Sequence, residues 1–454
     1  MDDISLHNQD TSASQIEQTQ THTSWRTESE ISGERQRFLR QCLLVAPDVQ
    51  QGVYPFREIS LTRADIEWLL TTHEQGHGPI EWSKPEQRAR EGIDLRGARM
   101  EHVDLRNLPI ACLRGGLTQE EWVGATLEQR DQAGVHLERA DLSGAHLEGA
   151  ILRGAFLQDA TLRGTFLAEA VLFQAHLERA YLRQAHLERA NMMYAHLEGT
   201  YLRKAWLMGT DLRQAICDHA TNLERVTFTD PQWGCALFAD IHWNNCNLSI
   251  IRWQHMLPLG DETLARRAPG QQKRASNRQQ RLSQIDSYRA AVRAHRQLAS
   301  VMQSQGMNDE AVPFAYRAQL LQRVVLWQEV RADALSENRV HVLRGLRQRI
   351  RGLSAWLFSC FLDGIAGYGY KPERSLLVYL FTIVVFAFSY VLLAHLQPVE
   401  ALIFSVTAFH GRGFFPGSFP LDNPVTALAA LEAVVGLLIE ISFIATFTQR
   451  FLEK

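Results

Sequence analysis

A short stretch near the C-terminus carries the residues whose order best suits ion chemistry. Residues 409–413 read Phe-His-Gly-Arg-Gly, after the moderately apolar run 399–409 and before a second, longer apolar run. Backbone that is not helical is tolerated at membrane depth only where it is buried in protein or lines a water-filled cavity. A helix, a loop with two glycines and a second helix, in this order, are the layout of a pore. The order therefore predicts a re-entrant loop at 399–416. The loop residues that we expect to form it are Thr407, Phe409, His410, Gly411, Arg412 and Gly413.

Two acidic residues interrupt the apolar run that follows this loop, Glu432 and Glu440. Ionisable side chains inside a membrane span are costly and usually face partner groups or water. Glu432 lies deeper in the run, so we expect it to make a structural hydrogen bond rather than to contact ions. Glu440 lies near the inner end, where it either snorkels to the membrane surface or faces a partner.

Other motifs with possible chemistry give weaker signals. His73 to His77 reads H-E-x-x-H, but zinc chemistry needs both histidines on one continuous helix together with a third ligand. Gly76, Gly78 and Pro79 would end such a helix within the motif, so we expect no metal there. The sequence has no phosphate loop, nucleophile elbow or catalytic cluster, so we expect neither an enzyme nor a cofactor.

Two long apolar stretches are able to hold the predicted loop in a membrane. Residues 375–396 contain no Asp, Glu, Lys or Arg, and residues 425–447 contain only the two glutamates. About 20 apolar residues span a bilayer, so both stretches are predicted transmembrane helices. Residues 355–366 are apolar but too short to cross, and we expect an interfacial helix there, at the start of a membrane domain that occupies 355–454.

The distribution of positive charge predicts the orientation of these spans. Arginine and lysine residues lie before the first span and after the second, whereas the connection carries only Arg412. The positive-inside rule therefore places both termini in the cytoplasm of a multi-pass protein of the inner (cytoplasmic) membrane. Residues 1–35 are polar, contain no apolar signal core and are expected to be a disordered tail.

A strict period of five residues dominates the centre of the chain. From Leu137 to Leu212 every fifth residue is leucine, except for Met192, and a small residue lies two positions before each of them. Neither a helix nor a strand keeps a period of five on one face, so the chain must turn a corner every five residues and stack on itself.

This A-x-L-x-x pattern, as in residues 145–149, resembles the pentapeptide-repeat family. The resemblance implies a right-handed quadrilateral β-helix whose interior is too narrow for a ligand, and we assign it to residues 92–254 with a helical insertion at 117–134. A one-residue slip after Leu212 moves the predicted core positions to larger residues. These positions are Leu223, Phe228, Trp233, Phe238, Trp243, Leu248 and Trp253. Five His-Leu-Glu triplets lie on the faces of the rod, either as solvated surface or as a metal or pH-sensing ladder.

Smaller segments surround the repeat. Residues 36–91 are a mixed segment with one helix, which the capping pattern of Thr62 and Asp65 starts. Residues 255–283 read as a linker, and 284–354 as a helical hairpin that resembles a single tetratricopeptide-type unit. The predicted fold class is thus mixed, with a β-helix, a helical hairpin and a C-terminal two-helix transmembrane pore domain.

Residues 404–413 and 431–438 resemble the two-transmembrane pore module of the bacterial potassium-channel superfamily. In that family a T-V-G-Y-G loop coordinates K⁺ with a ring of carbonyl groups. Here Arg412 replaces the aromatic residue and Phe414 replaces the usual Asp, so we do not carry over K⁺ selectivity. The resemblance implies a homotetramer, since one subunit supplies two spans and one loop. Its partners would be the lipid bilayer and inorganic ions.

A second class of function remains open. Some pentapeptide-repeat proteins resemble DNA and bind topoisomerases, but residues 135–214 hold nine acidic and nine basic residues. Such a balanced surface is a poor phosphate mimic, and nucleic acid is not an expected partner either. The alternative to an ion channel is therefore a non-conducting, membrane-anchored scaffold whose rod binds a cytoplasmic protein partner.

Overall fold

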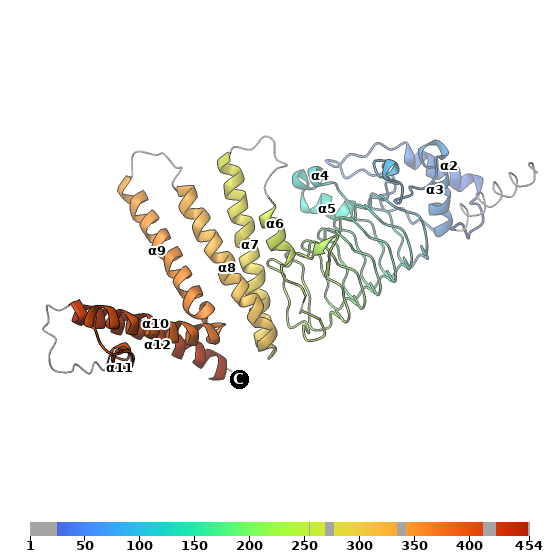
Figure 1. Cartoon of the computed structure of the whole chain (residues 1–454). Helices are drawn as coiled ribbons and strands as arrows, with labels where there is room; N and C mark the ends of the chain where they lie inside the picture. The colour runs from blue at the N-terminus through green and yellow to red at the C-terminus, as the bar shows by residue number, and fades with distance from the viewer. Residues whose placement is uncertain (1–24, 254, 268–276, 334–341, 412–423, 453–454) are drawn as a thin grey trace, which may run out of the picture. The chain divides into compact units, whose positions relative to one another are not determined.

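The computed structural model describes residues 25–253, 255–267, 277–333, 342–411 and 424–452 (Figure 1). The chain divides into two compact units. The first contains residues 1–267 and 293–310, and the second contains residues 268–292 and 311–454. Helix α7 (Asn277–Ser304) contributes residues to both units because the boundary falls within it.

The first unit begins with α2 (Gly33–Leu43), α3 (Arg63–Gly76) and the 3-10 turn η1 (Pro85–Gln87). Thr62 and Asp65 form the capping box that starts α3. The carboxylate of Glu67, buried on α3, accepts hydrogen bonds from the backbone N–H groups of Thr27 (3.0 Å) and Glu28 (3.1 Å). The last part of the expected disordered tail is therefore ordered, because its backbone N–H groups hydrogen-bond to the buried carboxylate of Glu67.

The five-residue period builds a rod of stacked coils. From His136 to His196, each side of a coil pairs with the side 20 residues later, as in the parallel bridges His136 to Phe156 and Phe156 to His176. Leu172 N–H, for example, donates to the carbonyl of Asn191 at 2.7 Å. Each side contributes one bridging residue before the chain turns, so longer strands do not form. Twenty residues per coil and five per side give the predicted four-sided coil.

Each corner of the rod depends on one left-handed residue two positions after the interior leucine. All sixteen such positions from Arg139 to Gln214 have positive φ, and ten of them are not glycine. A left-handed conformation costs a non-glycine residue roughly 1–2 kcal/mol. Hydrogen bonds between coils and the burial of the leucines must offset this cost. The interior leucines and the small residues beside them are at most 3 % exposed over 137–212.

Two insertions leave the rod. Residues 117–134 form α4 (Gln119–Gly124) and α5 (Leu127–Ala133), each started by its own capping box, where the sequence indicated one helix. The second insertion is a hairpin of β1 (Thr229–Asp230) and β2 (Gly234–Cys235), which pair antiparallel.

The hairpin corrects the predicted core position at Trp233. Its side chain is 36 % exposed, whereas the other predicted positions between Leu223 and Trp253 are buried. The Asp230 carboxylate accepts from Gln232 N–H at 2.7 Å, and Gly234 has a φ of +80°, so the chain reverses here instead of completing a side. The coil resumes at Phe238.

The C-terminal end of the rod is covered by α6 (Gly260–Arg266) and the second part of α7. Gly260 allows α6 to approach closely, since a Cβ there would lie 2.3 Å from the Cys235 carbonyl oxygen. Gln305 donates to the Cys246 carbonyl (2.7 Å), and Arg293 pairs with Asp240 (2.8 Å). The expected linker 255–283 thus contains a helix that closes the coil.

The second unit is helical. It begins with the first part of α7 and continues with α8 (Asn308–Asp333), α9 (Val342–Ala366) and η3 (Gly367–Gly369). The first three residues of α8, up to Glu310, belong to the first unit. Helices α10 (Pro372–Ala394), α11 (Pro398–Phe409) and α12 (Pro424–Leu452) follow. Helix α9 begins 13 residues before the expected interfacial helix 355–366, so it takes in the end of the predicted hairpin segment.

Candidate functional site

Helices α10 and α12 are long and apolar enough to cross a membrane. The qualifying segments are Glu373–Ala394 and Pro424–Ile444, and only 22 % of each tested window is buried inside the structure. The core helix of a soluble protein would be mostly buried instead. Phe381 on α10 is 70 % exposed and Val434 on α12 is 58 % exposed. Such apolar surface suggests association with a membrane.

Helix α11 is a short helix that packs against both α10 and α12 and lies beside them (Figure 1). Its 12 residues give a length of about 18 Å, too short to cross a hydrocarbon core of about 30 Å. Ala401, Phe404 and Ala408 are buried in a cluster with Tyr390 of α10 and Ala429 of α12.

The depth that α11 reaches follows from the contacts of its last turn. Phe409 packs edge-to-face on Tyr379 and clusters with Ile439 of α12. Tyr379 lies 15 residues before the end of α10, which corresponds to roughly 22 Å along that helix. The chain therefore runs from the end of α10 back to well past its midpoint.

Glu432 joins the three helices. Its side chain is fully buried on α12 and accepts a hydrogen bond from the Tyr390 hydroxyl of α10 at 2.6 Å. The Ser405 hydroxyl of α11 contacts its other carboxylate oxygen and lies 3.0 Å from the Ile383 carbonyl. A buried polar group is costly unless it is hydrogen-bonded, and here each oxygen of Glu432 has a partner. Glu432 therefore fixes how α11 sits between α10 and α12.

Gly436, one turn after Glu432, supports the end of α11. A Cβ at this position would lie 2.1 Å from the carbonyl oxygen of Phe409. Because this oxygen belongs to the backbone, no side-chain rotation could relieve the clash. The absence of a side chain lets α12 approach the last turn of α11. Sequence reasoning did not single out Gly436, although it lies in the 431–438 stretch that resembles a pore module.

The described loop residues surround the C-terminal end of α11. His410 lies next to this end, and its Nδ1 is 3.2 Å from Glu440 Oε1 of α12. Gly411 is left-handed, with a φ of +66°, and donates to the Ala408 carbonyl at 2.9 Å. Thr407 donates to carbonyls of its own helix. Two expected loop residues, Arg412 and Gly413, lie outside the described residues.

A polar cluster at the start of α10 was also missed by sequence reasoning. Asp363 of α9 accepts from the Tyr316 hydroxyl (2.9 Å) and Arg323 Nη1 (2.8 Å) of α8, and lies 3.7 Å from Arg374 Nη1 of α10. Burial, and then the bond to Asp363, raise the pKa of Tyr316. The signal that was available is that Asp363 is the one charged residue within the apolar stretch 355–366.

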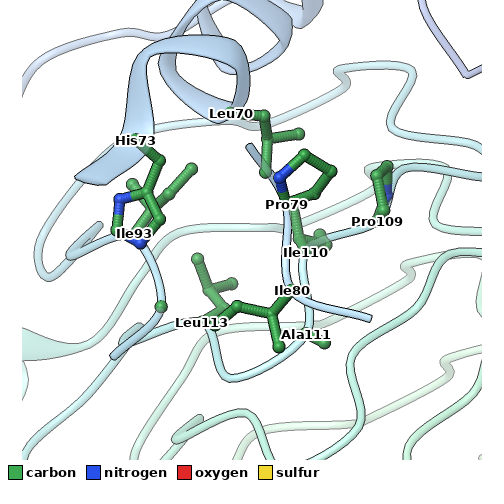
Figure 2. A pocket seen from close by; sticks show the side chains of 10 residues that line it. Leu70, His73, Pro79, Ile80, Ile93, Pro109, Ile110, Ala111 and Leu113 are labelled. Atoms are coloured by element: carbon green, nitrogen blue, oxygen red, sulfur yellow. The ribbon is translucent and has the colours of Figure 1, made fainter. Parts of the chain in front are cut away.

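The H-E-x-x-H motif does not form a helical ligand pair. Residues 73–75 have non-helical backbone angles, so His73 and His77 do not share a helical face. His73 Nε2 lies 2.8 Å from the Glu91 carbonyl. Beside it, Leu70, Ile80, Ile93 and Ile110 line an apolar pocket (Figure 2). Its cavity volume of about 10 Å³ is far below the 300–1,000 Å³ typical of small-molecule sites.

Comparisons with known proteins identify the rod. The family model described as pentapeptide repeats matches residues 133–167 and 170–207 in eight copies, so this part of the chain is a pentapeptide-repeat β-helix. No curated protein sequence matches the chain.

Three solved structures are similar to part of the chain. HetL of the cyanobacterium Nostoc, a pentapeptide repeat protein involved in heterocyst differentiation regulation, is 20 % identical over 34 % of this chain and 73 % of its own, with a TM-score of 0.14. A thylakoid-lumen pentapeptide repeat protein of Arabidopsis thaliana is 27 % identical over 22 % of this chain and 63 % of its own (TM-score 0.14). A plasmid-mediated fluoroquinolone resistance protein is 14 % identical over 36 % and 83 % (TM-score 0.17).

Proposed function

We propose that the protein is a membrane ion channel-like protein in which α10, α11 and α12 form one quarter of a homotetrameric pore. The rod would be a cytoplasmic sensing or docking domain. The observation that carries this proposal is the position of α11, which ends past the midpoint of α10 and is held there by Glu432 and Gly436. A plain extracellular hairpin between two anchors would have no reason to bury a carboxylate to hold a short helix at this depth.

The end of α11 supports assembly into an oligomer. A helix C-terminus leaves carbonyl groups without intrahelical partners. Gly411 N–H satisfies the carbonyl of Ala408, and lipid would offer no donor to the other carbonyl groups of the last turn at this depth. Val399 and Ile403 on α11 are also 69 % and 60 % exposed. Neighbouring copies arranged around a water-filled axis would cover the apolar face and solvate the carbonyl end.

The orientation of the chain follows from its charge distribution. Positive residues flank the two spans on the side of the N- and C-termini, which the positive-inside rule places in the cytoplasm. About residues 398–424 would face outward or dip into the membrane. In intact cells, a membrane-impermeant thiol reagent should label a cysteine placed in this connection and spare one at Gln174. Labelling at Gln174 would contradict the cytoplasmic location of the rod.

Planar-bilayer recording of the purified protein tests conduction. A ring of Arg412 side chains would repel cations at a narrow axis, so we expect a weakly selective or anion-tolerant pore. Arg412→Tyr should shift the reversal potential towards that of K⁺, and Gly411→Leu should abolish current because φ is +66° there. Gly364→Ala is the control, since its Cβ would meet nothing within 4 Å. A tetramer without current in the wild type and in Arg412→Tyr would contradict the proposal.

The Asp363 cluster offers a route from α8 to the pore helices. It connects α8, α9 and the first turn of α10, so a movement of α8 would reach α10 directly. In a conducting protein, Asp363→Asn should change open probability more than single-channel conductance.

The alternative is a non-conducting, membrane-anchored scaffold that binds a cytoplasmic protein. The column of Tyr181 and Tyr201, stacked at 4.8 Å and 48 % and 43 % exposed, favours this reading because exposed aromatic residues are common in protein interfaces. Light scattering in mild detergent distinguishes the two. A tetramer supports the pore, and a stable monomer or dimer supports the scaffold.

A further inference from the structure

The histidines of the rod form two stacked columns. In each His-Leu-Glu triplet, the imidazole Nδ1 lies 3.0–3.6 Å from the glutamate two residues later. One column contains His136, Phe156, His176 and His196, and the other contains His146, Phe166, His186 and Trp206. Neighbouring rings stack with centroids 4.2–5.3 Å apart.

The first column differs from the second at one place, where two histidines lie on adjacent coils. His176 and His196 stack directly, with ring centroids 4.7 Å apart and planes 6° apart. Phe156 precedes them in the column and Ile216 follows, so the pair has apolar neighbours on both sides. In the second column, the ring after His186 is Trp206 instead of a second histidine.

Glu178 adds an oxygen ligand beside this pair. Potential ligand atoms of His176, Glu178 and His196 all lie within 4.8 Å of one another. Glu178 Oε1 is 3.1 Å from His176, while Oε2 is buried and has no hydrogen-bond partner among the described residues, as is also true of Oε2 in Glu138, Glu148 and Glu198. The guanidinium of the neighbouring residue, Arg179, is not bound to Glu178, because it pairs with the Asp159 carboxylate at 2.8 Å. A buried carboxylate oxygen without a donor is the kind of group that a cation would satisfy.

We propose that His176, Glu178 and His196 bind one divalent transition-metal ion of the zinc class, held across two neighbouring coils of the rod. Two imidazoles and one carboxylate, with an open position for water, are a ligand set that Zn²⁺ accepts. With Zn–N bonds of about 2.0–2.1 Å, ligand atoms of a tetrahedral site lie roughly 3.4 Å apart. The two rings must therefore tilt out of their stack as the ion enters.

This site is independent of the proposed pore. Its ligands lie within the first unit, and binding requires neither a membrane nor a tetramer. Buried thiols are poor competitors, since burial raises the pKa of Cys235 and of Cys246 to about 12 and keeps both protonated. The ion would fasten two coils together near the middle of the rod and make the cytoplasmic domain sensitive to metal supply.

Calorimetric titration of the full-length, untagged protein in detergent with ZnCl₂ tests the proposal. We expect one equivalent to bind per chain, and Co²⁺ to give the intense visible absorption of a tetrahedral N/O site. His176→Gln and His196→Gln should each weaken binding at least tenfold, and Glu178→Gln should also weaken it. The matched control is His186→Gln, which removes the histidine of a His-Leu-Glu triplet that belongs to the other column.

A second control separates this site from a neighbouring cluster. Glu101, His136 and Glu138 also place ligand atoms close together but include one histidine, so His136→Gln should leave the stoichiometry and the Co²⁺ spectrum unchanged. Circular dichroism of each variant confirms that the rod is folded. The proposal is overturned if no saturable binding occurs, if folded His196→Gln binds as the wild type does, or if His186→Gln loses binding equally.

Discussion

The interior of the rod and the interior of the α10–α12 module are built on opposite principles. Along 137–212 the rod buries leucine and alanine, and its few buried polar side chains facing inward are threonines such as Thr165, whose hydroxyl donates to the Leu142 carbonyl at 2.8 Å. The helical module instead buries a carboxylate, a phenol and a hydroxyl together. A repeated apolar interior gives a rod its shape at any length, whereas a single polar cluster fixes one unique arrangement of three helices.

This difference indicates where function is concentrated. In the rod, the repeat leaves the outer faces free to vary, so chemistry resides in side chains such as His176 that point outward. In the helical module, the polar residues lie inside and determine how α11 is held. Substitutions should therefore have their largest effects on stability in the rod interior. In the module they should affect both stability and the proposed conduction.

The largest expected effect is that of a charge placed in the rod. Leu172 is fully buried, and Leu172→Asp would bury a carboxylate with no partner, at a cost of more than about 4 kcal/mol. We expect the rod to unfold in urea at much lower concentration, as followed by circular dichroism. Leu172→Met is the control, since Met192 fills the same position one coil later and such swaps cost less than about 1.5 kcal/mol. Equal stability of the Asp and Met variants would contradict a sealed apolar interior.

The next effect concerns the end of the rod, where a carboxylate is buried. Asp261 accepts from the N–H groups of Phe238 and Ala239, and burial raises its pKa from 3.8 to about 6. Between these two values the folded state holds a proton that the unfolded chain releases, so stability falls as the pH rises through about 6. The shift corresponds to roughly 3 kcal/mol at most between pH 4 and pH 7.

Asp261→Asn isolates this contribution. The amide keeps an acceptor for Phe238 N–H but cannot ionise, so the variant should lose this component of the pH dependence while the rest of the curve is unchanged. Urea unfolding of both proteins at several pH values, followed by circular dichroism, measures the difference. Parallel curves for the two proteins would mean that Asp261 has an ordinary pKa in the folded state.

The rod could be predicted from sequence because its structure is local and repeated. Each leucine at a spacing of five corresponds to one side of a coil. The pattern therefore predicts, position by position, which residues lie in the interior. The prediction failed at Trp233, where the spacing continues but Asp230, Pro231 and Gly234 turn the chain into a hairpin. Turn chemistry overrode the periodic pattern there, and these three residues were a readable signal.

The helical module could be predicted only in outline. Hydropathy indicates the two long helices and the short one between them, but it does not say which polar groups meet. Glu432 and Ser405 are 27 residues apart in sequence, and Tyr316 and Asp363 are 47 apart. Such pairs depend on helix packing, which no local pattern encodes. Gly436 was missed for the same reason, because the Phe409 carbonyl that requires it lies in another helix.

A smaller effect, in the helical module, comes from adding one methyl group. Gly436→Ala would place a Cβ against the Phe409 carbonyl, which forces α11 and α12 apart at a cost of roughly 1–3 kcal/mol. Unfolding by dodecyl sulfate in mixed micelles should show this loss. Gly364→Ala, which removes another glycine from a helix interior but meets no neighbour, should be neutral or slightly stabilising. Similar behaviour of the two variants would show that α12 does not need close approach to α11.

The smallest effect that we expect tests whether the polar cluster differs in kind from the rod interior. Tyr390→Phe removes one hydroxyl and leaves an oxygen of the buried Glu432 without its donor, which should cost about 1–3 kcal/mol, near the lower end because Ser405 still contacts the carboxylate. Tyr379→Phe is a control on the same helix, since its hydroxyl lies 3.5 Å from His410, at the limit of a hydrogen bond. Measured in mixed micelles, Tyr390→Phe should lose stability and Tyr379→Phe should not. If both are neutral, shape alone holds α11, and the module would be built on the same principle as the rod.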